Sequence, residues 1–528
     1  MNKKKLEYKI SINKIKAQLI YQPSNLNLLN NLAGFYFNSN DYQNAIKYYE
    51  KIIKLNNNAI TISNLALSYQ LIQDFSKAIS LFNESIELDP EYFAGYINLG
   101  SALSSIGMHD EFLKLSLKAL NKWPKSPELH TNVGVALLAL GHHKEARISL
   151  ETALLLNENS VDALFNIASI ESFEGNRTKA INIFEKLLEN SELLTEARTI
   201  QIKHSLGFEY LNSGKLKKGW EYYEYGFSPL IPHYLKRNPN RNFSTLRWNG
   251  SNIDNKTLMI WGEQGIGDEI LYSSLIPDLM KDVANLIIEC EPRIVSILQR
   301  SFPNATIRSP KFDTSNENFQ TLFDYDFQIP IGSLFQYYRK DIVDFHHANS
   351  KYIVTSKYLN EKYQKRLYEY ESKLKIGIIW RSGMLDPLRN LHYTNILDWG
   401  VIFELNNIEF INLQYGECEE ELIQAEEKFN KKIHRWNDVD LKNDLDDVIS
   451  IIENLDLVIA PCTATAWLAA GVGKPTLVFQ QKDWINLGQD YFPLNKNVKS
   501  FFPKQKNRMA ETLLDIRTYI DQVFYIGN

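Results

Sequence analysis

The stretch Asn132-Val-Gly-Val-Ala-Leu-Leu-Ala-Leu-Gly-His-His-Lys-Glu-Ala146 decides the fold of the N-terminal part of the chain, because its pattern returns at a fixed interval. It has a small residue, Gly134, two positions after its asparagine, a glycine in its middle and a second small residue at its end. The first small position recurs as Ala33, Ala66, Gly100, Gly134, Ala168 and Gly207. The second recurs as Ala45, Ala78, Phe112, Ala146, Ala180 and Gly219. Both series advance by 33, 34, 34, 34 and 39 residues, so the chain contains an internal repeat.

A period near 34 residues, with two small positions, a midpoint glycine and a proline such as Pro90 or Pro124 at the end, is the tetratricopeptide pattern. Each repeat is a pair of antiparallel helices that approach closely only where side chains are small. The glycine supplies the turn between the helices, and the proline ends the second helix. The pattern predicts an α-solenoid, a tetratricopeptide superhelix within residues 1–229, with six repeats and a possible extra helix before them.

An asparagine stands two residues before each of the first five small positions. The first helices of such an array line its concave groove, which is where partners usually dock. A carboxamide both donates and accepts hydrogen bonds, so a row of them can hold the backbone of an extended acceptor peptide without reading its sequence. The alternative is that each asparagine only satisfies the backbone of a neighbouring repeat. The predicted acceptor groove contains Asn31, Asn64, Asn98, Asn132 and Asn166.

Composition limits the remaining choices. A chain of 528 residues needs more than one domain. Its 58 Lys and Arg against 63 Asp and Glu give a net charge of -5, so no overall basic field favours nucleic acid or an anionic membrane. Three scattered cysteines suit a reducing cytoplasm, and Cys462 is expected to be a small buried thiol. The start of the chain does not resemble a secretory signal, and the apolar run Leu457–Gly473 is too short and broken for a membrane span.

The rest of the chain shows a different pattern. Residues 230–255 contain prolines and many asparagines and are predicted to be a linker between domains. After them, short β-rich runs alternate with helical ones, which predicts two α/β lobes, residues 256–350 and 351–528, with a cleft between them. The charged helix Lys357–Lys373 is expected to separate the lobes. Predicted strands are Thr257–Trp261, Leu286–Glu289, Ala305–Arg308, Lys375–Trp380, Glu409–Gln414, Lys432–Arg435, Leu457–Ala460 and Thr476–Phe479, with helices near Glu269–Lys281 and Arg293–Arg300.

The first lobe offers the loop Gly262-Glu-Gln-Gly-Ile-Gly-Asp268 between its first strand and a helix, where ligands of α/β proteins bind. Asp268 is the candidate catalytic residue, although it could simply cap the helix. A dinucleotide site is a weaker alternative: Glu289 lies where a ribose-binding acid would be, but Ile270 replaces the third glycine. The near-site loop residues are Glu263, Gln264, Gly265 and Gly267.

The second lobe offers Pro461-Cys-Thr-Ala-Thr-Ala-Trp467 between a strand and a helix. Backbone amides and hydroxyls there could hold a phosphate, unless the segment is an ordinary turn. Arg381, in Trp380-Arg-Ser-Gly383, and Arg389 could pair with a diphosphate, unless they are surface arginines. Asp324-Tyr-Asp326 looks like a metal-binding pair but better suits a strand edge, so no metal is expected.

These motifs together resemble the bacterial tetratricopeptide glycosyltransferases whose C-terminal half is similar to heptosyltransferases of the two-lobed GT-B class. Some relatives in that family are associated with flagellin glycosylation, and tetratricopeptide-bearing sugar transferases of eukaryotes thread acceptor peptide along an asparagine ladder. The resemblance rests on Gly219-Trp-Glu-Tyr-Tyr-Glu224, Leu246-Arg-Trp-Asn-Gly250, Trp261-Gly-Glu-Gln-Gly-Ile-Gly-Asp-Glu269, Ile288-Glu-Cys-Glu-Pro292, Trp380-Arg-Ser-Gly383, Asn412-Leu-Gln-Tyr-Gly416, Asp444-Leu-Asp-Asp447 and Gly471-Val-Gly-Lys-Pro475.

The resemblance implies a GT-B fold of two Rossmann-like lobes and a general base at Asp268. It also implies transfer of a sugar from a nucleotide-sugar, a co-substrate rather than a cofactor, to a cytosolic protein acceptor such as flagellin. The second-lobe loop departs from the family's Asp-Thr-Gly-x-x-His pattern, so a hexosyl, heptosyl or nonulosonyl donor is left open. The alternative is a non-enzymatic tetratricopeptide scaffold with a degenerate transferase domain. Donor-binding residues are expected to be Trp380, Arg381, Ser382, Arg389, Gln414, Thr463, Ala464 and Thr465.

Overall fold

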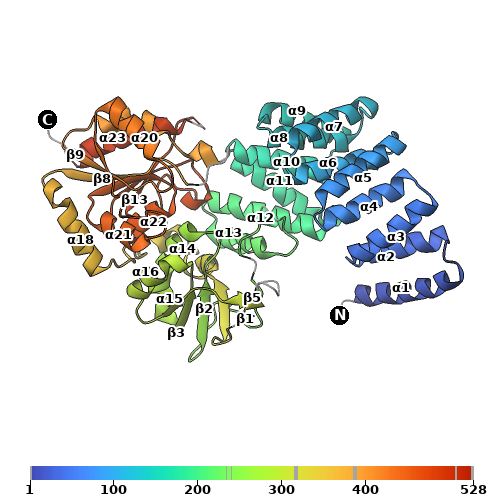
Figure 1. The fold of residues 1–528 in the computed structure, drawn as a ribbon, viewed down its shortest axis with the longest axis horizontal. Coiled ribbons are helices and arrows are strands. Elements are labelled where there is room, and N and C mark those ends of the chain that lie inside the picture. Colours follow the sequence, from blue (N-terminus) through green and yellow to red (C-terminus); the bar gives the residue numbers. More distant parts are fainter. Residues whose placement is uncertain are drawn as a thin grey trace. The chain divides into compact units, whose positions relative to one another are not determined.

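The computed structural model describes residues 3–232, 235–239, 241–313, 319–320, 322–383, 389–505 and 508–524. The chain forms two compact units, Met1–Leu194 and Thr195–Asn528. The first unit is helical, and the second contains two parallel β-sheets covered by helices (Figure 1).

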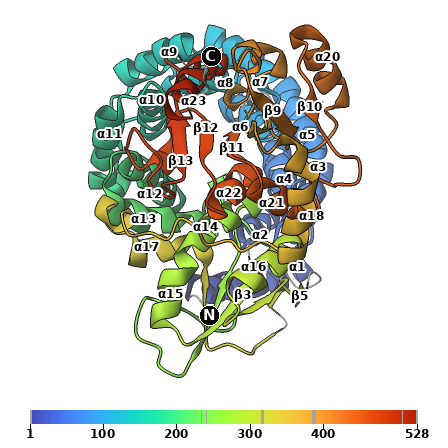
Figure 2. The same ribbon diagram turned by 90° about the vertical axis from the view of Figure 1, so that its left-hand side faces the viewer.

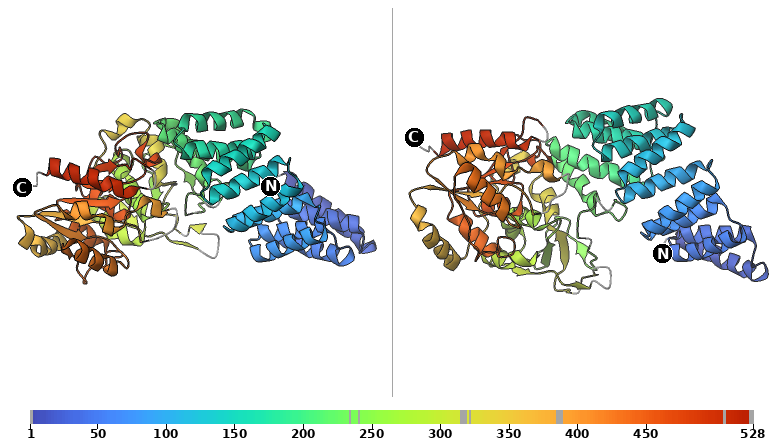
Figure 3. Two further views of the ribbon diagram at one scale, coloured as in Figure 1. Left: turned by 90° about the horizontal axis from the view of Figure 1, so that it is seen from above. Right: turned by 45° about the horizontal axis from the view of Figure 1, so that its top comes forward.

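The first unit begins with α1 (Lys3–Tyr21), followed by five helix pairs that stack in chain order (Figure 3). The first helices of successive pairs contact one another, as α4 does α6 and α6 does α8. This confirms the predicted tetratricopeptide solenoid and its extra leading helix. The pairs are α2 (Leu26–Asn38) with α3 (Tyr42–Leu55), α4 (Ala59–Leu71) with α5 (Phe75–Leu88), α6 (Phe93–Ser105) with α7 (His109–Lys122), α8 (Pro127–Ala139) with α9 (His143–Leu156), and α10 (Val161–Phe173) with α11 (Arg177–Glu189).

Close helix packing explains the small residues of the repeat. A β-carbon on Gly134 would lie 2.6 Å from Cγ of Leu150, so even an alanine there would require the Leu150 side chain to shift. The large Phe112 fits because Gly100 opposite it has no side chain. A β-carbon on Gly100 would lie only 2.7 Å from Cε2 of the Phe112 ring. The midpoint glycine Gly141 has a φ of +82°, a left-handed conformation that favours glycine.

The sixth helix pair, α12 (Glu196–Asn212) and α13 (Leu216–Tyr223), belongs to the second unit. The indole of Trp220 stacks on Phe335 at 4.7 Å, and its Nε1 donates a hydrogen bond of 2.8 Å to the carbonyl of Arg339 in the first lobe. Phe208 contacts Trp484 of the second lobe, with ring centres 5.7 Å apart. The boundary between the compact units therefore lies one repeat before the predicted end of the repeat domain at residue 229.

The first lobe has a parallel sheet in the order β1-β7-β2-β3-β4. Its helices are α14 (Ile266–Tyr272), α15 (Ile276–Asp282), α16 (Val295–Ser301) and α17 (Phe335–Tyr338). The predicted helix Glu269–Lys281 is interrupted by the 3₁₀ turn Ser273–Leu275, and a new helix begins at Ile276 with Pro277 in its first turn, where the missing N–H of proline is tolerated. The strands are β1 (Leu246–Arg247), β2 (Thr257–Trp261), β3 (Asn285–Glu289), β4 (Thr306–Arg308) and β7 (Phe327–Pro330), and β5 (Phe312–Asp313) with β6 (Phe319–Gln320) forms a separate antiparallel pair.

The segment 230–255 is not the simple connector that its composition predicts. It contributes β1, which pairs with β7 at the edge of the first sheet. Ile231, Arg237 and Trp248 are buried within the second unit. The described parts of this segment therefore belong to the first lobe.

The second lobe has a parallel sheet in the order β10-β9-β8-β11-β12-β13, and Figure 2 shows β11, β12 and β13 side by side. All five strands predicted for this lobe are present, and β13 (Val498–Phe501) was not predicted. The strands are β8 (Leu374–Ile378), β9 (Ile408–Asn412), β10 (Ile433–His434), β11 (Leu457–Pro461), β12 (Thr476–Phe479) and β13. The helices are α18 (Lys357–Leu367), α19 (Gly400–Phe403), α20 (Glu419–Phe429), α21 (Leu445–Glu453), α22 (Ala464–Gly471) and α23 (Thr512–Val523). Among the described residues, no helix is long and apolar enough to cross a membrane.

Candidate functional site

The predicted loops of the two lobes meet at the start of α14 and the start of α22. Each helix follows a strand of its own sheet, β2 in the first lobe and β11 in the second. The backbone of Gly267 approaches α22 so closely that a β-carbon there would lie 3.5 Å from both the Ala464 nitrogen and Cδ1 of Trp467. The structure thus brings together the two motifs that the sequence places about 200 residues apart, and Gly267 provides the room for their contact.

Asp268 lies in the first turn of α14, partly buried, beside this junction. It does not occupy the N-cap position, which is Gly265, and no side chain caps this helix. Burial, and to a smaller extent the nearby charge of Glu263, raise the pKa of Asp268 to about 7, against the opposing effects of a backbone hydrogen bond and of Arg237. A carboxyl group that titrates near neutral pH can accept a proton from a substrate hydroxyl.

The other residues of the loop divide into a buried anchor and an exposed edge. The Glu263 carboxylate is fully buried, forms a bidentate ion pair with Arg237, and accepts a hydrogen bond of 2.9 Å from the Gly332 amide. Gln264 is exposed and has a left-handed φ of +67°, and Gly265 is also exposed. Glu263 therefore anchors the loop to the protein interior, while Gln264 and Gly265 are exposed to solvent.

The start of α22 presents backbone amides next to Gly267. The Thr463 hydroxyl caps the helix by accepting a hydrogen bond of 3.4 Å from the Ala466 amide. The first amides of a helix have no partner within it, so those of Ala464 and Thr465 suit an anionic group. The neighbouring Cys462 is exposed, so the expectation of a buried thiol is wrong; its Sγ lies 2.6 Å from Oε1 of Gln480.

The residues after β8 are engaged in internal contacts. Trp380 is fully buried and donates its indole N–H to Glu421 at 2.5 Å. Arg381 pairs with Glu421 and also donates to the Glu417 carbonyl at 2.8 Å. Oε1 of the buried Gln414 accepts the backbone amides of both Trp380 and Arg381, at 3.2 and 3.1 Å.

These contacts make Trp380 and Gln414 supports of the loop. Ser382 lies nearer the solvent, with its Oγ 3.3 Å from the hydroxyl of Tyr415. The side chain of Arg389 lies outside the described residues, although its backbone forms a 3₁₀ turn, Arg389–His392.

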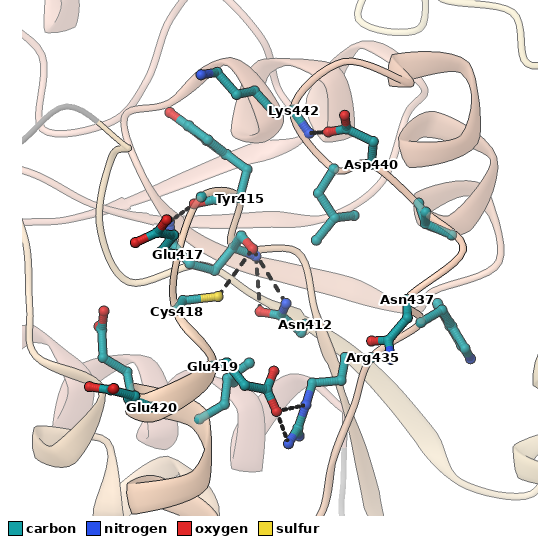
Figure 4. A pocket seen from close by; sticks show the side chains of 17 residues that line it. Asn412, Tyr415, Glu417, Cys418, Glu419, Glu420, Arg435, Asn437, Asp440 and Lys442 are labelled. Carbon is teal, nitrogen blue, oxygen red and sulfur yellow. Dashed lines mark hydrogen bonds and ion pairs between the residues drawn. The ribbon is translucent and has the colours of Figure 1, made fainter.

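A pocket of about 630 Å³ lies at the carboxyl ends of β9 and β10, the edge of a parallel sheet where ligands bind (Figure 4). Its volume is within the range of small-molecule sites. Arg435 in its wall pairs with Glu419 at 2.8 Å and with Glu426 at 3.0 Å. The lining residues include Asn412, Gln414, Tyr415, Glu417, Glu419, Glu420, Arg435, Trp436, Asn437, Asp440 and Lys442.

Of the residues in this pocket, sequence reasoning identified only Gln414. The signal that could have found the others is position, because they follow the predicted strands Glu409–Gln414 and Lys432–Arg435 at the ligand-binding edge of the sheet.

Two alternatives from the sequence find no support. Glu289 is fully buried and paired with Arg241 and Arg308, so it cannot bind a ribose as a dehydrogenase would require. Asp324 pairs with Arg308 at 2.6 Å, and Asp326 pairs with Lys256. Among the described residues no cluster of three or more His, Cys, Asp or Glu could hold a metal ion.

The five asparagines of the predicted acceptor groove lie on the first helices of the five pairs in the first unit, and all are exposed or half-buried. Asn98 donates to the hydroxyl of Ser63 in the preceding repeat at 3.2 Å, and Asn166 donates to the Asp162 carbonyl of its own helix at 2.7 Å. Within the described part of the chain, no donor reaches the carboxamide oxygen of any of the five. The carboxamide oxygens of these asparagines are therefore available to accept hydrogen bonds from a partner.

Sequence comparisons with known proteins agree with the repeats. Tetratricopeptide repeat family models match residues 24–91, 127–160 and 161–192. TPR repeat-containing protein YpiA of Bacillus subtilis is 25% identical over 162 residues, 31% of this chain and 38% of that protein. A solved structure of MamA from Desulfovibrio magneticus RS-1 has a TM-score of 0.28 and 14% identity, covering 32% of this chain and 97% of that one. Protein FlbA of Caulobacter vibrioides is 26% identical over 443 residues, 81% of this chain and 73% of that protein. This chain therefore carries tetratricopeptide repeats and is similar to FlbA beyond them, into the α/β lobes.

Proposed function

We propose that the protein is a glycosyltransferase that moves a sugar from a nucleotide-sugar to a protein acceptor bound by the repeats. The observation that carries the proposal is the position of Asp268. Asp268 directly follows Gly267, where the first lobe meets the start of α22 in the second, and its carboxyl group has a pKa near neutral. A proton acceptor beside unpaired helix amides is what transfer of a sugar from an anionic leaving group requires.

In the proposed reaction, the acceptor hydroxyl attacks the anomeric carbon of the donor sugar and gives its proton to the Asp268 carboxylate. The bond between that carbon and the phosphate oxygen breaks, and the electron pair leaves with the nucleotide. The Ala464 and Thr465 amides and the Thr463 hydroxyl would stabilise the charge on the leaving group. Arg389 remains a predicted further cation. The scheme uses no metal ion.

The pocket at β9 and β10 suits the nucleoside of the donor. Tyr415 and Trp436 in its wall are aromatic surfaces on which a base can stack. Glu417 can accept the hydrogen bonds of ribose hydroxyls, a role that acidic residues have in other nucleotide-binding lobes. The order β10-β9-β8-β11 places this pocket and the start of α22 on one edge of the sheet, as a GT-B transferase would need.

The acceptor side of the proposal rests on the asparagine row of the first unit. Its free carboxamide oxygens can accept backbone N–H groups of an extended peptide, which favours a protein acceptor over a small molecule. Flagellin is the candidate that the family resemblance implies, and the reaction would then take place in the cytoplasm.

The direct test is a screen of nucleotide-sugars by thermal shift, followed by a transfer assay with flagellin as acceptor, read as a mass increase. A donor present at 100 times its Kd should stabilise the second unit by about 2.7 kcal/mol. Asp268→Asn should abolish transfer while keeping donor binding. The control is Asp515→Asn, since Asp515 also lies in the first turn of a helix but is exposed. Undiminished transfer by Asp268→Asn would remove this residue as the base.

A scaffold without catalytic activity is the second candidate. The observation that favours it is the neutralisation of Arg381 by Glu421, together with the four carboxylates of Glu417, Glu419, Glu420 and Asp440 around the pocket. Such a lining offers little attraction to a diphosphate. A protein that responds to no nucleotide or nucleotide-sugar, but still binds its protein partner through the repeats, would be this scaffold.

A further inference from the structure

A buried ion pair lies beneath the loop that carries Asp268. The guanidinium of Arg237 donates from Nε to Oε2 of Glu263 at 2.7 Å and from a second nitrogen to Oε1 of the same carboxylate. Neither side chain has any exposed surface. A bidentate pair of this kind fixes both partners in orientation as well as distance. The Gly332 amide adds a hydrogen bond of 2.9 Å to Glu263, so the carboxylate is held on two sides.

The same arginine reaches the end of the sixth helix pair. Its third nitrogen donates to Oε1 of Glu224, at 2.9 Å, in the 3₁₀ turn that follows α13. The guanidinium lies between the rings of Tyr223 and Phe227, with its carbon 4.0 and 4.2 Å from the ring centres. The hydroxyl of Ser333 donates to Glu224 at 2.6 Å, and Arg247 pairs with Glu224 from the other side. A chain of charges thus runs from the last repeat, through Arg237, to the loop.

The charged and titratable groups around Asp268 come from each element packed against it. Glu263 belongs to its own loop, Glu269 and Tyr272 to its own helix, Tyr223 to α13, and Arg237 to the irregular segment that precedes β1. Glu263 and Arg237 have opposite effects on the pKa of Asp268. The charges of Glu263 and Arg237 sum to zero. Removing either one therefore changes the net charge near Asp268 by one elementary charge.

We propose that Arg237 and Glu263 are positioning residues that hold the loop 262–268 and determine at which pH Asp268 becomes charged, and that Glu224 ties them to the last repeat. This inference takes Asp268 from the proposed function as the group whose charge matters. It makes the end of the repeat array a structural part of the candidate active site. It also explains two motifs that the chemistry does not use, Gly219–Glu224 and Leu246–Gly250, since they supply Glu224 and Arg247 to this cluster.

The test needs no substrate, because a raised pKa in the folded state appears in the pH dependence of stability. The folded pKa of Asp268 lies above that of the unfolded chain, so ionisation of this group removes stability as the pH rises from about 4 to about 7. Asp268→Asn lacks this contribution, whereas the raised pKa of Glu269 acts in wild type and variant alike. The melting temperature of Asp268→Asn minus that of wild type should therefore grow over this range in the full-length protein and then level off.

The inference is tested by repeating the measurement with Glu263→Gln. This variant leaves the positive charge of Arg237 without its main partner, which lowers the pKa of Asp268. In the Glu263→Gln background, the change in melting temperature on adding Asp268→Asn should be smaller than in wild type. It should also level off at a lower pH. Replacing both Glu263 and Arg237 by Gln restores the net charge and should move the pH dependence back toward that of wild type. Arg237→Lys keeps the charge and should leave the pH dependence unchanged while lowering the melting temperature.

A pair that only supports the fold would lower the melting temperature in all these variants without moving the pH dependence, and that result would overturn the proposal. If Glu263→Gln does not fold, Glu224→Gln decides, because the Glu224 side chain is partly exposed and Glu263 keeps its partner. It should move the pH dependence in the same direction by a smaller amount, and no movement would contradict the link to the last repeat. The glycosyltransferase proposal is judged separately by transfer, so each can fail without the other.

Discussion

The fifth and sixth helix pairs follow the same repeat pattern, yet they belong to different units of the molecule. In the fifth pair the second small position, Ala180, is followed by Ile181, and the next aromatic position is Phe184. In the sixth pair the matching residues are Gly219, Trp220 and Tyr223. Ile181 and Phe184 are buried within the helical unit, whereas Trp220 stacks on Phe335 of the first lobe. Repeat periodicity determines where helices form, and the bulk of the residues beside the small positions determines what each helix packs against.

The largest expected effect comes from cutting the chain on either side of the sixth pair. A fragment that begins at Thr195 keeps Trp220, Glu224 and their partners, and we expect it to fold and unfold cooperatively. A fragment that begins at residue 230 exposes the surface around Phe335 and leaves the buried charge of Arg237 without Glu224. It should be insoluble or unfolded, as circular dichroism and size-exclusion chromatography would show. A well-folded second fragment would contradict the assignment of the sixth pair to this unit.

The next effect comes from truncating the matched apolar residues. Trp220→Ala should cost about 3 to 5 kcal/mol, in the range known for large aromatic residues in cores, and should lower the melting temperature of the second unit. Ile181→Ala should cost about 2 to 5 kcal/mol and should affect the helical unit instead. Calorimetry, with the fragment from Thr195 used to assign the transitions, measures both. A shift of the same transition by both variants would mean that the fifth and sixth pairs unfold together.

A smaller effect is expected at the first small position of the sixth pair. A β-carbon on Gly207 would lie 2.8 Å from the backbone nitrogen of Tyr223, which cannot move aside as a side chain can. Gly207→Ala should therefore cost about 1 to 3 kcal/mol, as overpacking does. The control is Gly34→Ala, because nothing lies within 4 Å of its added β-carbon, and this change should stabilise its helix by about 1 kcal/mol. Urea denaturation of both variants gives the comparison.

Substitution of the groove asparagines is expected to have the smallest effect on stability but to weaken the binding of a partner. Changing Asn98, Asn132 and Asn166 together to Ala should weaken acceptor binding about tenfold or more, because several hydrogen bonds of about 1 kcal/mol each are lost. Donor binding should not change. Ser205→Ala is the control, since Ser205 has the matching position in the sixth pair. Titration calorimetry with the acceptor measures this, and unchanged acceptor affinity would make the asparagines structural.

Local patterns in the sequence were enough to predict most of the elements. Small residues at fixed intervals identified the helix pairs, and apolar runs such as Thr257–Trp261 identified strands that the structure confirms. The short strand Leu246–Arg247 could not be found, because it is stabilised by pairing with Phe327 and Gln328, far away in the chain, and has no apolar pattern of its own. The strand Val498–Phe501 was missed for a similar reason, since it forms by pairing with β12.

The candidate site was predictable to a similar extent. Asp268 and the Thr463 turn could be identified because each follows a buried strand at the edge where ligands bind. The roles of Trp380, Arg381 and Gln414 could not, since a sequence does not show that Glu421 and the backbone already occupy their polar atoms. Arg237 was missed because its asparagine- and proline-rich segment predicted a linker between domains, whereas in the fold its guanidinium is bonded to the carboxylates of Glu263 and Glu224 and to the hydroxyl of Ser333.

The step of 39 residues between the last two repeats has an evolutionary consequence. The five additional residues fall near the 3₁₀ turn Ser191–Leu193, directly before the boundary of the two units at Leu194. All steps before that point are one module long, so duplication or loss of a whole module lengthens or shortens the array without changing a residue of the second unit. The length of the repeat array can thus diverge between related proteins while the second unit stays constant. An artificial chain with one 34-residue module inserted after residue 158 would reproduce such an event in a single step.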